Sequence, residues 1–197
     1  MNEPAVFIKA EHALQSVVDQ IRDDQWAMEM PPEFATRATK PLTLREVINY
    51  HAYDDAWVPD MLAGRTMGEV GADAFKGDLL GDDPKSTFAA IVARACAAAE
   101  MLDDEALACT VHCSFGDFSA REYLWQITSF RGLRAHDLAE VIGVDSTLPA
   151  DLVQGLWEQL LPHAEEWRAL GVFGPKVQVP DRAPLQDRLL ALTGRQP

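Results

Sequence analysis

The sequence predicts an all-α fold, a bundle of four long helices with a C-terminal appendage, from three kinds of signal. Residues 4–23 place their apolar side chains on one stripe at helical spacing. Two capping boxes, T-L-R-E from Thr43 and S-A-R-E from Ser119, provide reciprocal hydrogen bonds for the start of a helix. Asp83 followed by Pro84 is a cap and a first-turn proline. These signals mark the starts of separate helices.

The rest of the bundle follows in order. The four predicted helices cover residues 4–23, 43–64, 84–102 and 120–142, and Gly143 ends the last of them. Pro31 and Pro32 begin a loop that runs to about Pro41, and the glycine-rich, acidic stretch 68–81 is a second loop. Residues 107–115 are rich in β-branched residues and cysteine, which favours a short extended segment.

The C-terminal part differs in composition from the bundle. A helix starts at Pro149 and bends at Pro162, because proline has no N–H for the helix ladder. An extended stretch at 176–179 and a short helix at 185–192 follow, with Gly194 as the stop. No linker separates these parts. We therefore predict one domain over residues 1–197, with the bundle in residues 4–143 and the appendage in residues 144–197.

Composition narrows the class of partner. The formal charge is −14, from 31 acidic against 17 basic residues, and it would repel nucleic-acid phosphates and anionic lipids. No stretch approaches the roughly 20 apolar residues of a membrane-spanning helix. Cys96, Cys109 and Cys113 are odd in number and lack metal-site spacing, so we interpret them as core residues in a reducing compartment. We expect a cytoplasmic protein without a nucleic-acid or membrane partner.

The most informative stretch is residues 128–143, inside the fourth predicted helix. Arg134 and Asp137 interrupt an otherwise apolar row at helical spacing, formed by Tyr123, Ile127, Phe130 and Val141. Two interpretations stay open. Arg134 and Asp137 form a buried ion pair, joined by Tyr50 and Asp54, or Arg134 recognises a carboxylate ligand through its planar guanidinium group.

Three stretches resemble one known family. They are T-L-R-E-V-I-N-Y-H from residue 43, H-D-L-A-E-V-I-G from residue 136, and the C-terminal F-G-P-K-V-Q-V-P-D-R-A-P-L-Q-D-R-L-L-A-L-T-G-R-Q-P. Together they are similar to the DinB-like helix-bundle superfamily, in its actinobacterial branch related to mycothiol-dependent maleylpyruvate isomerase. The resemblance implies an up-and-down four-helix bundle.

It also implies a divalent metal, zinc or nickel, together with the thiol mycothiol. In that family a histidine of the second helix and a glutamate and histidine of the fourth hold the metal. This sequence has Tyr50, Phe130 and Arg134 at those positions. A guanidinium about 4 Å from a divalent ion would be repelled by about 8 kcal/mol at an effective dielectric constant of about 20. We therefore expect no metal at the family position.

A displaced metal site is the alternative arrangement. His51 with Asp55, and His136 with Glu140, are pairs four residues apart, and such pairs can chelate a metal between two helices. However, His136 follows Arg134 by two residues, which turns its side chain about 200° away around the helix.

Two functional hypotheses follow, and the sequence assigns no catalytic residue. The first is a thiol (mycothiol)-dependent transferase or isomerase that lacks the usual metal ligands and takes a small-molecule thiol. The alternative is a non-catalytic protein without metal that binds a small carboxylate or acts as a dimeric interaction module, a homodimer included. Both use one candidate pocket, formed by Tyr50, His51, Asp54, Phe130, Arg134 and Asp137.

Overall fold

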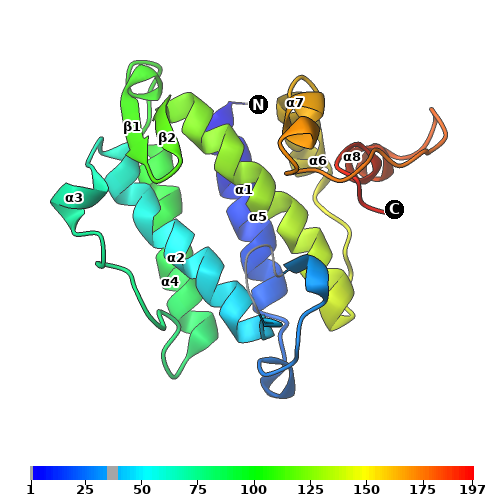
Figure 1. The fold of residues 1–197 in the computed structure, drawn as a ribbon, viewed down its shortest axis with the longest axis horizontal. Helices are drawn as coiled ribbons and strands as arrows, with labels where there is room; N and C mark the ends of the chain where they lie inside the picture. The colour runs from blue at the N-terminus through cyan, green and yellow to red at the C-terminus, as the bar shows by residue number, and fades with distance from the viewer. Residues whose placement is uncertain (1, 35–39) are drawn as a thin grey trace.

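The computed structural model describes residues 2–34 and 40–197, and it is predominantly helical (Figure 1). The helices are α1 (Glu3–Val18), α2 (Leu44–Leu62), α3 (Met67–Val70), α4 (Pro84–Glu100), α5 (Ala120–Ile142), α6 (Ala150–Leu160), α7 (Ala164–Ala169) and α8 (Leu185–Leu192). One antiparallel hairpin, β1 (Thr110–Cys113) and β2 (Gly116–Ser119), precedes α5. The predicted all-α class is confirmed apart from this hairpin.

The helix starts follow the local signals in the sequence. The Thr43 hydroxyl accepts the Glu46 N–H at 3.2 Å, and the Glu46 carboxylate accepts the Thr43 N–H at 2.7 Å. Ser119 forms the same reciprocal box at the start of α5, and Asp83 caps α4. Gly143 has a φ of 75° and ends α5, as predicted.

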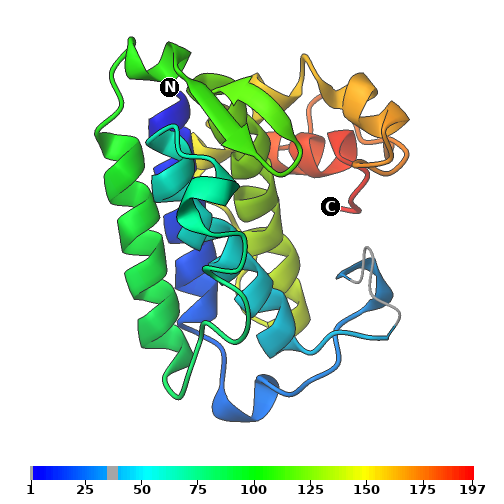
Figure 2. The same ribbon diagram turned by 60° about the vertical axis from the view of Figure 1, so that its left-hand side comes forward.

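The four long helices α1, α2, α4 and α5 lie side by side, but not in the expected up-and-down order. α1 and α5 run in one direction, whereas α2 and α4 run in the other (Figures 1 and 2). An ion pair of 2.6 Å between Glu3 and Arg121 joins the starts of α1 and α5. Lys85, at the start of α4, donates to the carbonyl of Asp19 just after α1 at 2.8 Å. The up-and-down prediction is therefore wrong, because residues 63–83 return along the length of α2 before α4 begins.

Several connections also differ from the sequence-based expectation. The stretch 68–81 includes part of α3, one turn with its own capping box from Thr66. Within the segment 107–115 only Thr110–Cys113 is extended, because Ala106–Ala108 forms a 3-10 helix; this strand pairs with a second strand that the sequence did not indicate. Lys176–Val179 forms no strand, and α1 ends at Val18 rather than near residue 23. The predicted loop up to Pro41 includes residues 35–39, which lie outside the described residues.

Close contacts at glycine attach the C-terminal part to the long helices. A Cβ on Gly155 of α6 would lie 2.7 Å from a methyl carbon of Val6 on α1. One on Gly132 of α5 would lie 2.7 Å from a methyl carbon of Leu156. Both glycines therefore allow α6 to approach helices that it could not reach with larger residues. Farther along, α8 packs against α6.

Candidate functional site

A buried charged cluster joins three of the long helices. Arg131 of α5 is 2% exposed, and its guanidinium meets Glu11 of α1 and Asp55 of α2, which are both fully buried. Its Nε lies 3.1 Å from Glu11 and 3.0 Å from Asp55, while another of its nitrogens lies 2.6 Å from Asp55. Arg131 also donates to the carbonyl of Ile127 at 3.1 Å. These bonds hold the guanidinium in one orientation.

Burial disfavours the charge of the acidic groups in this cluster. Burial and then the neighbouring Asp55 raise the pKa of Glu11 well above its usual range, while Arg131 acts in the opposite direction. Burial opposes the charge of Arg131, but Asp55 and Glu11 together raise its pKa. The neutral form of Glu11 is therefore favoured in the interior, which reduces the buried charge that Arg131 has to offset.

His51 of α2 lies beside this cluster and has an unpartnered ring nitrogen. Burial lowers the pKa of His51 well below its usual range, and the charges of Arg134 and Arg131 lower it further. The imidazole is therefore neutral at physiological pH. Within the described chain its Nδ1 is buried and has no hydrogen-bond partner. Leaving such a group unsatisfied costs about 1–3 kcal/mol.

Asp54, three residues after His51, has a pKa that is shifted toward neutrality. Burial raises its pKa from 3.8 to about 6, against the opposing effect of Arg131. Residues three apart on a helix share a face, so His51 and Asp54 lie on the same side of α2. This face combines a neutral imidazole, a carboxyl group that changes charge near pH 6, and the fields of two guanidinium groups.

The predicted ion pair of Arg134 and Asp137 forms, but it is not the main contact of either residue. Their closest charged atoms are 3.7 Å apart. Asp137 instead accepts two hydrogen bonds from Arg195, at 2.7 and 2.9 Å, which tie the chain after α8 to α5. The Arg134 guanidinium lies over the Phe34 ring, 4.3 Å from its centre. Asp137 is therefore an anchor for the C-terminal segment, whereas Arg134 remains 20% exposed.

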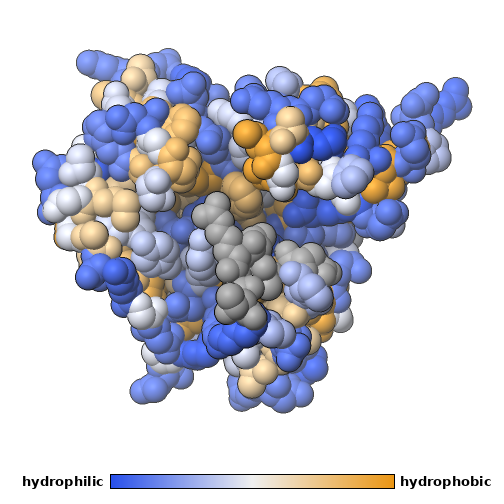
Figure 3. All heavy atoms as spheres, viewed as in Figure 1, coloured by the Kyte–Doolittle hydropathy of each residue, from blue (hydrophilic) through white to orange (hydrophobic). Residues whose placement is uncertain are grey.

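Two further members of the predicted pocket lie at the surface. Tyr50 is 66% exposed and Phe130 is 47% exposed. Phe130 stacks on Trp167 of α7 at 5.9 Å, in a region where Figure 3 shows apolar side chains gathered around α7. The predicted pocket is thus divided. His51 is buried and Asp54 is partly buried near Arg131, His51 also lies within the field of Arg134, and the two aromatic residues are exposed.

The structure does not bring the displaced metal ligands together. Asp55 binds Arg131, whereas His136 Nδ1 lies 3.0 Å from the Ser146 carbonyl. Glu140 accepts a hydrogen bond from the Ser146 hydroxyl. No group of three or more His, Cys, Asp or Glu side chains that fits a metal occurs in residues 2–34 and 40–197. His136 and Glu140 therefore serve the loop that follows α5.

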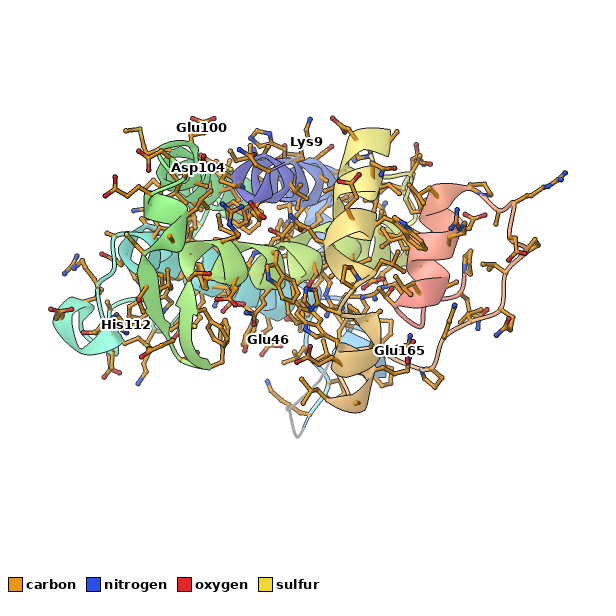
Figure 4. The ribbon with its side chains drawn as sticks, turned by 90° about the horizontal axis from the view of Figure 1, so that it is seen from above. Lys9, Glu46, Glu100, Asp104, His112 and Glu165 are labelled. Carbon is orange, nitrogen blue, oxygen red and sulfur yellow. The ribbon has the colours of Figure 1, made fainter. Side chains whose placement is uncertain are left out.

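The three cysteines have different environments. Burial raises the pKa of Cys96 to about 12, so it stays an inert thiol in the core. Cys113 is partly buried and donates to the Gly116 carbonyl at 3.0 Å. Cys109 is exposed, so the prediction of a core position is wrong for this residue. His112, between Cys109 and Cys113 in the sequence, forms a hydrogen bond of 2.9 Å with Asp117. It lies on the opposite side of the molecule from Glu165 of α7 (Figure 4).

Sequence reasoning missed the two central residues, Arg131 and Glu11, although a signal for both was present. Arg131 lies at helical spacing between Leu124 and Leu138, which are both fully buried. Glu11 follows Phe7 by four residues on the predicted stripe of α1. The predicted inner face of α5 was centred on Arg134, which is about one residue too far around the helix.

Comparison with protein-family models, with curated proteins and with solved structures found no match to this chain. In the part of the chain that the structure describes, no helix has the length and apolar character needed to cross a membrane. The site's own chemistry must therefore carry any functional argument.

Proposed function

We propose that this chain is a DinB-like bundle protein that binds a small carboxylate ligand, without a metal, between α2 and α5. The ligand would lie beside His51, Asp54 and Arg134. The observation that carries this proposal is the buried, unpartnered Nδ1 of His51 beside two guanidinium groups. A neutral imidazole with a proton on Nδ1 offers a donor, and a positive field favours an anionic acceptor.

Arg134 supplies the charge that this ligand needs. Its side chain is 20% exposed, whereas that of Arg131 is only 2% exposed and bonds Glu11 and Asp55. The Phe34 ring lies 4.3 Å from the guanidinium carbon and attracts its charge. A planar guanidinium binds a carboxylate through two parallel hydrogen bonds, which an ammonium group cannot do. The favoured ligand is therefore a carboxylate rather than a neutral molecule.

Asp54 gives the site a pH dependence. Above pH 6 its carboxylate repels a ligand of the same sign, whereas below pH 6 the protonated group can donate a hydrogen bond. His51 stays neutral over this range because its pKa is lowered. Ligand affinity is therefore expected to fall as the pH rises through about 6, and Asp54→Asn should remove this fall.

The direct test is calorimetric titration with succinate, pyruvate and benzoate, compared with their amides. We expect at least one carboxylate to bind, and Arg134→Gln to weaken it by about tenfold or more, the loss of one charge-assisted pair. Arg121→Gln is the matched control, because Arg121 is an exposed partner of Glu3 on α1. Equal affinities in the two variants, or no binding by any carboxylate, would remove the proposal.

A second candidate keeps the thiol chemistry that the resemblance implies. Asp54 has a pKa of about 6, which suits a general base for a thiol, and it lies beside a positive field that would favour the thiolate. A thiol-dependent transferase or isomerase, mycothiol being the expected thiol, would then work without the family's metal. A thermal shift with mycothiol that Asp54→Asn abolishes would favour it. The absence of any shift with small thiols would leave carboxylate binding as the only candidate.

A further inference from the structure

A cavity lies between α2 and α4, and its volume is about 360 Å³. Small-molecule sites usually occupy about 300–1,000 Å³, so this cavity suits a small ligand. Its apolar walls are Ala56 and Pro59 of α2, Ile91 and Ala97 of α4, and Phe75 of the connection that crosses between these helices. The walls therefore offer an apolar surface to one side of the ligand.

Arg94 provides a cation in the wall of this cavity. It is exposed on α4, three residues from both Ile91 and Ala97, and these positions share one helix face. Within the described residues no ion pair of Arg94 with an acidic side chain occurs within 4.0 Å. Its guanidinium is therefore available to a carboxylate from solution.

One acceptor lies in the α2 wall of the same cavity. Asp60 lines the cavity, and its side chain is 20% exposed. One oxygen of Asp60 bonds Arg65 at 2.6 Å, and a carboxylate can accept further hydrogen bonds. An N–H donor entering the cavity would thus meet the carboxylate of Asp60.

We infer that this cavity binds a free amino acid with an apolar side chain. The α-carboxylate would pair with Arg94, the α-ammonium group would donate to Asp60, and the side chain would contact Phe75 and Ile91. A simple fatty acid would leave Asp60 without this donor, and a simple amine would leave Arg94 without an anion. The site is separate from the α2–α5 face and does not depend on the function proposed for it.

The test is a titration of the full chain with L-leucine. Binding is monitored through the NMR chemical shifts of the backbone amides of Ile91 and Phe75. The comparison ligands are 4-methylpentanoate, which lacks the amine, and 3-methylbutylamine, which lacks the carboxylate. We expect leucine to bind at least about tenfold more tightly than either, since each lacks one charge-assisted contact. Equal affinity for leucine and one of these analogues, or no shift at millimolar leucine, would overturn the inference.

Two variants locate the site on α4. Arg94→Gln should lower the affinity for leucine by about tenfold or more, to the affinity that the wild type has for 3-methylbutylamine. Ala97→Leu should block the cavity, whereas Ala93→Leu, an exposed alanine on the same helix outside the cavity walls, should bind leucine normally. Arg134→Gln should also leave leucine binding unchanged. Loss of leucine binding in Arg134→Gln but not in Arg94→Gln would move the ligand to the α2–α5 face and refute the assignment.

Discussion

At the scale of single residues, Arg131 determines the charge balance of the interior. It contacts carboxyl groups from α1 and α2, so one side chain connects three helices. Removing one member of a buried ionic group leaves the others uncompensated, which costs about 3–5 kcal/mol. The bonds of Arg131 therefore matter more to the fold than those of Arg134, which the sequence had singled out.

Arg131→Met should lower the free energy of unfolding by about 3–5 kcal/mol, because Glu11 and Asp55 would lose their cation. Urea denaturation at neutral pH measures this change. Arg121→Met is the matched control, and its exposed pair with Glu3 should contribute less than about 1 kcal/mol. Similar losses in the two variants would contradict a central role for Arg131.

Asp54 should make the protein less stable as the pH rises. Its pKa is raised from 3.8 to about 6 in the folded chain, so the folded state binds more protons than the unfolded state between these values. Stability from this group therefore falls from about pH 4 to about pH 6, by up to about 3 kcal/mol. Asp54→Asn should be more stable than the wild type at pH 7.

The difference in free energy of unfolding between Asp54→Asn and the wild type separates the effect of Asp54 from that of His51. The lowered pKa of His51 changes stability in the opposite direction below pH 6.5. Denaturation curves at pH 4, 5, 6 and 7 should show the difference appear and then level off. A difference that stays constant over this range would mean that Asp54 does not titrate as the structure indicates.

At the scale of helices, the contact between α6 and α1 depends on the absence of a side chain at Gly155. Alanine in an exposed helix is normally about 1 kcal/mol more favourable than glycine. Here its Cβ would lie 2.7 and 2.9 Å from the two methyl carbons of Val6, which is closer than such atoms can approach. Overpacking of this kind costs about 1–3 kcal/mol.

Gly155→Ala should therefore destabilise the wild-type chain but be neutral or stabilising in a Val6→Ala background. A double-mutant cycle measured by thermal or urea unfolding tests this reversal of sign. The same effect of Gly155→Ala in both backgrounds would show that α6 does not press against Val6.

The helices that the sequence predicted well are those with a local signal. Capping at Thr43, Asp83 and Ser119 depends on residues within one turn, so the start of a helix can be recognised without knowledge of the fold. The β1–β2 hairpin was only half recognised, because its second strand, G-D-F-S, has a weak pattern and becomes a strand through pairing with its neighbour.

At the scale of the whole molecule, the direction of α4 was not predictable from its own residues. It is set by the connection 63–83, which crosses back along α2 and includes Phe75 packed edge-on against Trp57 at 4.9 Å. Such a contact between distant parts of the chain leaves no periodic pattern. A single domain, a homodimer and a cytoplasmic location stay predictions.

The candidate site was predictable only in part for a similar reason. The sequence identified His51, Asp54 and Arg134, which lie together near Arg131. It could not tell that Asp137 would be bound by Arg195, because these residues are 58 positions apart. Helical periodicity shows which residues share a face, but the partner of that face is decided by how the helices pack.

The central claim is that His51 and Arg134 hold a carboxylate, and the imidazole itself provides the most direct measurement. Nitrogen-15 NMR of the His51 ring should show a neutral imidazole near pH 7. Adding the carboxylate that binds best should shift the Nδ1 resonance in the wild type and in Arg121→Gln, but much less in Arg134→Gln. An Nδ1 resonance that does not respond to any carboxylate, or responds equally in Arg134→Gln, would contradict the account.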